Sequence, residues 1–98
     1  MSAADPHLSV VIPVYNEEAI VESAGLELAK GLSERGWDYE IIFAENGSRD
    51  RTPEILERMT KEHPRLKWFH SETPNYGSAL KAGILKAKGA LVVCDEID

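Results

Sequence analysis

The feature that most constrains the fold is the alternation of short apolar runs with longer amphipathic segments along the 98-residue chain. The runs are rich in β-branched or other large apolar side chains and have the length of strands. They cover residues 8–14, 37–44, 66–69 and 90–94. Strands that alternate with helices need right-handed crossovers, which produce a mostly parallel sheet. The chain is therefore predicted to be an α/β sandwich of three layers.

The three segments between these runs are predicted helices. In the first, Asn16 is the expected N-cap and the helix runs to about Glu34. The second is expected to be capped by Asp50 or Thr52, and a proline stops it. The third begins at Tyr76 and is rich in Ala and Gly, which predicts close packing against a sheet.

Composition bounds the class of protein. Ninety-eight residues allow one small domain, with residues 1–7 as a tail and residues 8–98 as its body. A net charge of -6 argues against a binder of nucleic-acid backbones. The single cysteine excludes an internal disulfide and fits a reducing compartment. No signal peptide or membrane-spanning run is recognised, so we expect a cytoplasmic location, with any membrane association supplied by parts not in this chain.

Acidic residues follow the last apolar run directly. Residues 90–94 are uniformly apolar, which predicts a strand buried on both faces, and Asp95, Glu96 and Asp98 come next. Acids at the carboxyl end of such a strand lie where open α/β sheets bind ligands. If the chain stays extended, Glu96 and Asp98 project to the same side and repel each other unless a cation lies between them. A hard divalent cation such as Mg²⁺, accompanied by phosphates, would satisfy the pair.

Two further polar turns are expected at the same edge of the sheet. Residues 15–17 follow the first predicted strand and residues 45–48 follow the second. Convergence of such turns is typical of a nucleotide crevice. The sequence has neither a Gly-x-Gly-x-x-Gly motif after its first strand nor a phosphate-binding Gly-Lys-Ser/Thr loop. A nucleotide bound here would therefore need its phosphates neutralised by a metal rather than cradled by glycines.

Four segments together resemble the family 2 glycosyltransferases with the GT-A fold. Residues 10–17, Val-Val-Ile-Pro-Val-Tyr-Asn-Glu, resemble that family's opening strand. Residues 41–50 are similar to its second-strand segment, residues 75–83 to its Gly-rich third helix, and residues 96–98 stand where it carries an Asp-x-Asp motif. The match is strongest for polyprenyl-phosphate sugar transferases. It implies a Rossmann-like fold of the GT-A type, truncated after the fourth strand, that forms the N-terminal nucleotide-binding portion of a catalytic domain.

The resemblance also implies roles for individual residues on the nucleotide side. Pro13, Tyr15 and Glu17 would line the pocket for the base and ribose. Asn46 would contact the base, and Lys81 would approach the diphosphate. The family usually has two aspartates where this chain has Glu45 and Asn46, so its base preference can differ from the family norm.

On the metal side, the resemblance implies that Glu96 reaches the ribose or the metal, and that Asp98 coordinates Mg²⁺ or Mn²⁺. The implied reaction is an inverting transfer of a sugar from a UDP- or GDP-sugar to an acceptor, such as a polyprenyl phosphate or a glycan. The family's general base lies beyond residue 98, so no catalytic base is assigned and the chain alone is expected to be inactive. Self-association through the exposed edge of the sheet is a further expectation.

Two other classes of protein remain open from the residues alone. One is a Rossmann-like module that binds a nucleotide and transfers no sugar. The other is an interaction domain whose acids are only solvated turn residues. In the same way, Lys81 has an alternative interpretation as a solvated helix residue.

Overall fold

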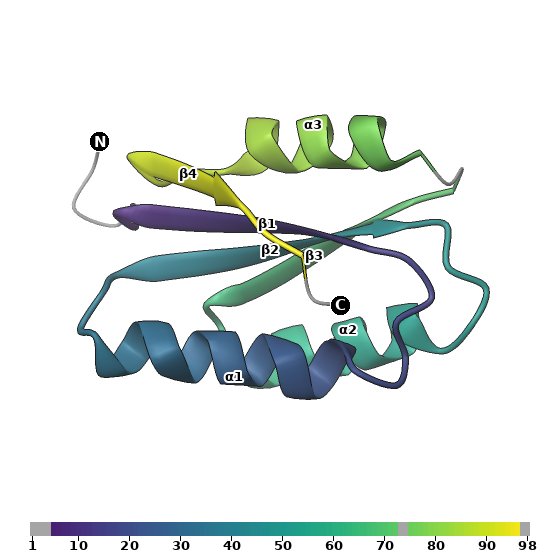
Figure 1. Cartoon of the computed structure of the whole chain (residues 1–98), viewed down its shortest axis with the longest axis horizontal. Helices are drawn as coiled ribbons and strands as arrows, with labels where there is room; N and C mark the ends of the chain where they lie inside the picture. Colours follow the sequence, from purple (N-terminus) through teal and green to yellow (C-terminus); the bar gives the residue numbers. More distant parts are fainter. Residues whose placement is uncertain (1–4, 73–74, 97–98) are drawn as a thin grey trace.

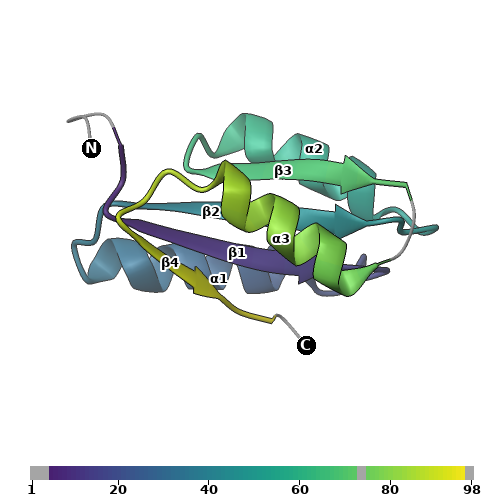
Figure 2. The same cartoon turned by 90° about the horizontal axis from the view of Figure 1, so that it is seen from above.

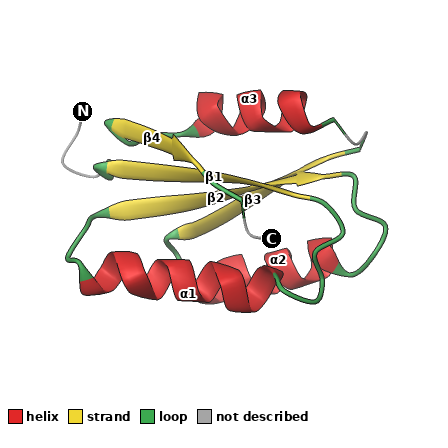
Figure 3. Ribbon diagram, viewed as in Figure 1, coloured by secondary structure: helices red, strands yellow, loops and turns green. Residues whose placement is uncertain are grey.

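The computed structural model describes residues 5–72 and 75–96. Strands and helices alternate along it in the order β1 (Leu8–Val14), α1 (Val21–Glu34), β2 (Tyr39–Asn46), α2 (Thr52–Glu62), β3 (Leu66–Ser71), α3 (Tyr76–Lys86) and β4 (Leu91–Cys94). The strands form one parallel sheet in the order β3-β2-β1-β4. Helices α1 and α2 cover one face and α3 covers the other (Figures 1 and 3). The prediction of a three-layer α/β sandwich is confirmed.

The core lies on both sides of the two central strands, β1 and β2. All eight residues of β2 are buried. On the side of α1 and α2, Phe43 of β2 packs in a cluster with Leu56 and Met59 of α2. On the other side, Ala79 of α3 packs against the sheet, with no exposed surface.

Small residues bring α3 close to the sheet, as their abundance in that segment predicts. A methyl group on Gly83 would lie 2.5 Å from Cγ1 of Val11, well inside van der Waals contact. Seen from above, α3 lies across the sheet, with β3 and β4 at its two edges (Figure 2). The first turn of α3 thus lies near the carboxyl ends of the strands.

The prediction that the last strand is buried on both faces is wrong. β4 is an edge strand, and within the described residues it pairs with β1 alone. Leu91 is 61% exposed and Val93 is 41% exposed. The uniform apolar sequence of β4 therefore does not mark a central strand. Within the described residues, β4 has one open edge and exposes apolar side chains.

The predicted start of the first helix is also wrong. The helix begins at Val21, not after Asn16, and Ile20 stands at its N-cap position without a side-chain cap. Asn16 instead takes a left-handed backbone conformation with φ of 50°, which asparagine tolerates better than most residues. Among the described helices, none is both long and apolar enough to cross a membrane.

Candidate functional site: a polar pocket at the carboxyl ends of the strands

A pocket of about 230 Å³ lies at the carboxyl ends of β1 and β2, beside the chain that leaves β4. It is lined by Pro13, Val14, Tyr15, Glu17, Asn46, Tyr76 and Glu96. The structure thus brings together five of the residues singled out from the sequence: Pro13, Tyr15, Glu17, Asn46 and Glu96. This grouping follows from the parallel sheet, because the carboxyl ends of neighbouring parallel strands share one edge.

The turn after β1 is tied to the turn after β2 by side chains of both. The backbone N–H of Asn16 donates to Oγ of Ser48 over 2.9 Å. Oδ1 of Asn16 in turn accepts from the backbone N–H of Arg49 over 2.8 Å. This exchange explains the left-handed conformation of Asn16, whose side chain binds the neighbouring turn instead of capping α1.

A second tie joins the next residues of the same two turns. The backbone N–H of Glu17 donates to Oγ1 of Thr52 over 2.9 Å, and that of Glu18 donates to Asp50 over 3.1 Å. Asp50 also accepts from the backbone N–H and the hydroxyl of Thr52, at 2.9 and 2.5 Å. The prediction that Asp50 or Thr52 caps α2 is wrong, because Arg51 stands at the N-cap position and makes no side-chain cap hydrogen bond. Asp50 instead lies one residue before the N-cap and binds Thr52, the first residue of the helix. Burial raises the pKa of Asp50, but the hydrogen bonds from Thr52 and Glu18 outweigh it and hold that pKa below its usual value.

The end of β2 supplies one buried acid and one amide. Glu45 has no exposed surface; one of its oxygens accepts from the backbone N–H of Ser48 over 2.5 Å, and the other contacts Nδ1 of His70 on β3. Glu45 therefore supports the turn and does not face the pocket. Asn46, which lines the pocket, accepts at Oδ1 from the backbone N–H of Asn75 over 2.6 Å. That bond orients the amide of Asn46.

The start of α3 contributes a residue that sequence reasoning missed. Asn75 is the N-cap of α3, where its side chain accepts from the backbone N–H of Ser78 over 2.9 Å. The next residue, Tyr76, lines the pocket, and its hydroxyl donates to Oε1 of Glu96 over 3.0 Å. The sequence held a signal for Tyr76. A helix that follows a strand in a parallel sheet begins near the edge where the strands end, so a tyrosine directly after the N-cap lies at that edge.

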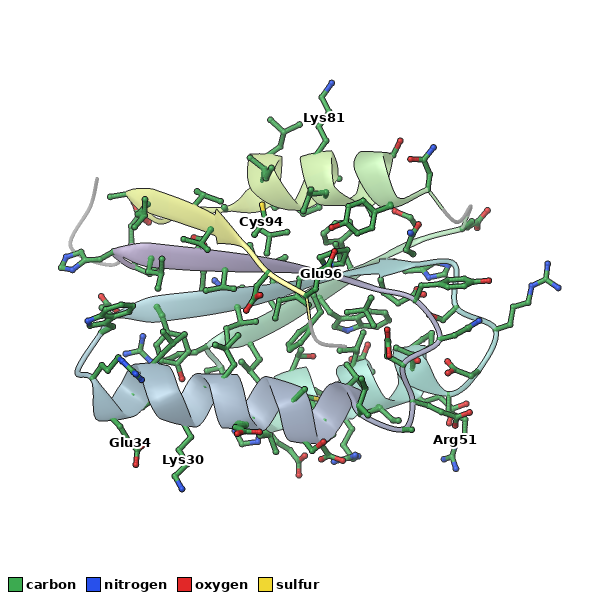
Figure 4. All side chains as sticks on the ribbon, in the orientation of Figure 1. Lys30, Glu34, Arg51, Lys81, Cys94 and Glu96 are labelled. Atoms are coloured by element: carbon green, nitrogen blue, oxygen red, sulfur yellow. The ribbon has the colours of Figure 1, made fainter. Side chains whose placement is uncertain are left out.

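Glu96 lies just past β4 with its carboxylate at the pocket (Figure 4). Its backbone N–H donates to Asp95 over 2.8 Å, and none of the described residues forms an ion pair with it. An exposed carboxylate without a cationic neighbour has the chemistry of a ligand for a hard cation. Asp98, the other predicted metal ligand, lies outside the described residues. Within them, no group of three His, Cys, Asp or Glu side chains is placed to hold a metal.

Lys81 is not brought to the pocket. Its side chain is exposed and extends from α3 away from the sheet (Figure 4). A larger groove of about 500 Å³ lies between α1 and the end of β4, and it contains Trp37 together with Asp95 and Glu96. Apolar side chains of α1 and the charged residues Glu27 and Arg35 form its other wall, so it runs along α1 and contains no residue of the turns that follow β1 and β2.

The fold and pocket define an α/β domain with a polar pocket at the carboxyl ends of a parallel sheet, the edge at which open α/β sheets bind ligands. The family model described as "Glycosyl transferase family 2" matches residues 9–95. The chain therefore belongs to glycosyl transferase family 2, and the family resemblance predicted from its motifs is confirmed.

Individual relatives agree with this assignment. The chain is 37% identical over 90 residues to the uncharacterized glycosyltransferase YkcC of Bacillus subtilis, covering 89% of this chain and 28% of that protein. It is 34% identical over 93 residues to an undecaprenyl-phosphate 4-deoxy-4-formamido-L-arabinose transferase of Pseudomonas aeruginosa, covering 93% of this chain and 27% of that protein. The chain thus spans less than a third of the length of either relative.

Solved structures show the same fold. TarS from S. aureus in complex with UDP superposes with a TM-score of 0.75 at 26% identity, over 93% of this chain and 27% of that chain. A mannosyltransferase from Pyrobaculum calidifontis, in complex with GDP-Man and Mn²⁺, superposes with a TM-score of 0.78 at 24% identity, over 98% of this chain and 28% of that chain. The fold of this chain is therefore that of the GT-A glycosyltransferases.

Proposed function

We propose that the chain is the donor-binding part of a glycosyltransferase that moves a sugar from a nucleoside diphosphate sugar to an acceptor. The observation that carries the proposal is the pocket itself, where residues from three strand ends and from the first turn of α3 converge. Family membership supplies the class of reaction. The binding of UDP by TarS makes a UDP-sugar the first donor to test.

In this proposal the base and ribose lie against Pro13, Tyr15 and Glu17. Tyr15 and Tyr76 are exposed aromatic residues at the pocket, and a base can stack on such rings. The amide of Asn46 reads the base. Its Oδ1 accepts from the backbone N–H of Asn75, which fixes the orientation of the amide, and in this proposal Nδ2 donates to the base.

A divalent metal, Mg²⁺ or Mn²⁺, fits the chemistry of Glu96, whose exposed carboxylate has no cationic neighbour among the described residues. Glu96 and Asp98 would hold it. When bound, it would neutralise the diphosphate and stabilise its departure. The work of this chain's own residues is to hold the base and ribose still and to orient the donor. Lys81 would have to swing from the outer side of α3 to meet a diphosphate.

The transfer would proceed with inversion, by direct attack of the acceptor hydroxyl or phosphate oxygen on the anomeric carbon of the sugar. A carboxylate base outside these 98 residues would take a proton from a hydroxyl acceptor. The name of the Pseudomonas relative favours a polyprenyl phosphate as the acceptor of the complete protein.

Mapping the pocket by nuclear magnetic resonance tests the proposal. Titration of the ¹⁵N-labelled chain with UDP and Mg²⁺ should shift the amide signals of Tyr15, Glu17, Asn46 and Glu96. Signals on the exposed side of α2, such as that of Lys61, serve as the internal control and should stay in place. Shifts spread evenly over the surface, or no shifts at millimolar UDP, would contradict the proposed pocket.

A further inference from the structure

A buried carboxylate lies at the amino ends of the strands, at the far end of the sheet from the pocket. Glu40, the second residue of β2, is 2% exposed. Its Oε2 accepts from the hydroxyl of Ser9 over 2.5 Å and from the backbone N–H of Lys88 over 2.7 Å, and its Oε1 accepts from Nζ of Lys67 over 2.7 Å. The hydroxyl of Ser9 accepts in turn from the backbone N–H of Gly89 over 2.8 Å. Glu40 and Ser9 therefore tie β1, β2 and β3 to the residues that lead into β4.

The chain before β4 touches β1 at this point. A methyl group on Gly89 would lie 2.7 Å from the backbone nitrogen of Ser9 and 2.8 Å from the carbonyl carbon of Leu8. Such contacts with backbone atoms cannot be relieved by a side-chain rotation. Only glycine lets the chain enter β4 at this distance from β1, so the position of Gly89 relative to Ser9 is tightly fixed.

The sequence of β4 does not by itself determine how β4 aligns with β1. Register is normally specified by an alternation that buries one face of a strand. β4 reads Leu-Val-Val-Cys, and three of these four residues are exposed. A shift that brings Ala90 into the ladder would exchange one apolar side chain for another at every position. A shift the other way would do so at all positions but the last, where Asp95 would replace Cys94. Val92 is the one residue of β4 that packs against a buried cluster. The register seen here, with Leu91 opposite Leu8 and Cys94 opposite Val11, is therefore only weakly specified by the strand and needs contacts outside it.

The register of β4 determines the position of Glu96, the acid that lies two residues after the strand. A shift of β4 by one residue moves the chain about 3.3 Å and turns each side chain to the other face of the sheet. Glu96, two residues after β4, would then leave the pocket and the hydroxyl of Tyr76. We propose that Ser9 and Glu40 are positioning residues, which fix the register of β4 on β1 and thereby place Glu96 at the nucleotide pocket. The inference rests on the proposed function for the role of Glu96.

Two variants of the 98-residue chain test this inference. Ser9→Ala removes the hydroxyl between Glu40 and Gly89. Glu40→Gln keeps the size of the side chain but turns one of its two acceptors into a donor. The matched control is Leu56→Val, which loosens the core beside α2 without touching β4. All are compared at a temperature where the folded state dominates.

The first readout is amide hydrogen exchange of Leu91 and Asp95, whose N–H groups donate to the carbonyls of His7 and Val11 at 3.0 Å and so report the register directly. The second is the affinity for UDP in the presence of Mn²⁺. Ser9→Ala and Glu40→Gln should each speed exchange at both amides about tenfold relative to the amides of central β2, and should each weaken UDP binding about tenfold. Leu56→Val should change neither the relative exchange rate nor the UDP affinity.

The outcomes separate the two claims. Unchanged exchange at Leu91 and Asp95 in both variants overturns the register role, whatever the nucleotide result. Faster exchange with UDP affinity intact shows that β4 is held by Ser9 and Glu40 but that Glu96 does not need this placement, which also overturns the inference. If the unaltered chain binds no UDP while its β4 exchange responds as expected, the proposed function fails and the register role of Ser9 and Glu40 stands. Should Ser9→Ala not fold, Glu40→Gln alone decides.

Discussion

The backbone N–H of Asn16 donates to Oγ of Ser48 over 2.9 Å, joining two turns that are 32 residues apart in the chain. Both turns carry residues of the pocket: Tyr15 and Glu17 flank Asn16, and Asn46 precedes Ser48 by two positions. The pocket wall is therefore built before any ligand arrives, and a binding site that is already ordered loses less entropy on binding.

Replacing Ser48 with alanine should loosen this wall. The exposed N–H of Asn16 can turn to water, so we expect a loss of only about 1 kcal/mol in the free energy of unfolding but about a fivefold loss in UDP affinity. Ser23→Ala is the matched control, because the hydrogen bond that the Ser23 hydroxyl makes among the described residues is to the carbonyl of Ile20 at the start of α1. Equal UDP affinities for the Ser48 and Ser23 variants, by calorimetry, would show that the tie does not organise the pocket.

The hydroxyl of Tyr76 should matter for metal-dependent binding. It donates to Glu96 over 3.0 Å, and Tyr76→Phe removes the donor while keeping the ring. We expect the Mn²⁺-dependent part of UDP affinity to fall about fivefold, because Glu96 loses the bond that orients it. Tyr76→Ala should weaken UDP further and also without metal, since the ring is lost as a stacking surface. If the two variants behave alike, the hydroxyl has no separate role.

The base preference should respond to the chemistry of residue 46. With Oδ1 of Asn46 held by Asn75, the amide offers a donor to the base. Asn46→Asp removes that donor and presents a carboxylate oxygen, which prefers the ring N–H of uracil to the ring acceptor of cytosine. The ratio of UDP affinity to CDP affinity should therefore rise about tenfold. An unchanged ratio would place the base elsewhere.

Stability should fall in acid because two carboxylates are held ionised by the fold. Burial raises the pKa of Glu40, but hydrogen bonds from Lys67, Ser9 and Lys88 outweigh it and leave the pKa below its ordinary value of 4.5. Asp50 is likewise held below its ordinary value of 3.8. A carboxylate whose pKa is lowered by folding contributes stability at pH values above its unfolded-state pKa. This contribution is lost as the pH falls through the folded-state pKa, so the free energy of unfolding should drop below about pH 4.5.

Denaturation at pH 7, 5, 4 and 3 measures this dependence. Glu40→Gln should be less stable than the unaltered chain at pH 7 and lose less stability on acidification. Glu57→Gln, on the exposed side of α2, changes the net charge by the same amount and serves as the control. A Glu40→Gln curve parallel to that of the unaltered chain would contradict the role of Glu40 as a stabilised carboxylate.

Self-association through β4 remains a prediction from the sequence. Leu91 and Val93 are exposed, and the outer edge of β4 has no partner strand within the described residues. Edge strands of this kind pair with other chains unless charge prevents it. Analytical ultracentrifugation should show a concentration-dependent dimer that Val93→Lys abolishes. Glu57→Gln on the exposed side of α2 raises the net charge by the same one unit and serves as the control. A monomer at all concentrations would refute the prediction.

The order of strands and helices could be predicted because each is encoded locally. The run at residues 8–14 and the stripe of Leu56 and Met59 have the periodicity of a strand and of a helix, and the structure places both as expected. The grouping of Tyr15, Asn46 and Glu96 followed from the rule that parallel strands share their carboxyl edge.

What local pattern could not show is which residues bond across the fold. Asparagine is a favoured N-cap residue, yet the side chain of Asn16 accepts a hydrogen bond from the backbone N–H of Arg49 instead. The contact of Glu45 with His70 depends on the pairing of β2 with β3, and an apolar run such as β4 reads the same whether both faces are covered or open. The errors thus fall where long-range contacts override a correct local preference.

The most direct test of the account is a calorimetric titration of the chain with UDP and with GDP, each with and without Mn²⁺. The account predicts that at least one nucleotide binds about tenfold more tightly with Mn²⁺, and that Glu96→Ala and Asp98→Ala each remove that gain while Glu72→Ala, an exposed acid at the end of β3, does not. Equal weak heats under all conditions, with no loss in the Asp98→Ala variant, would contradict it.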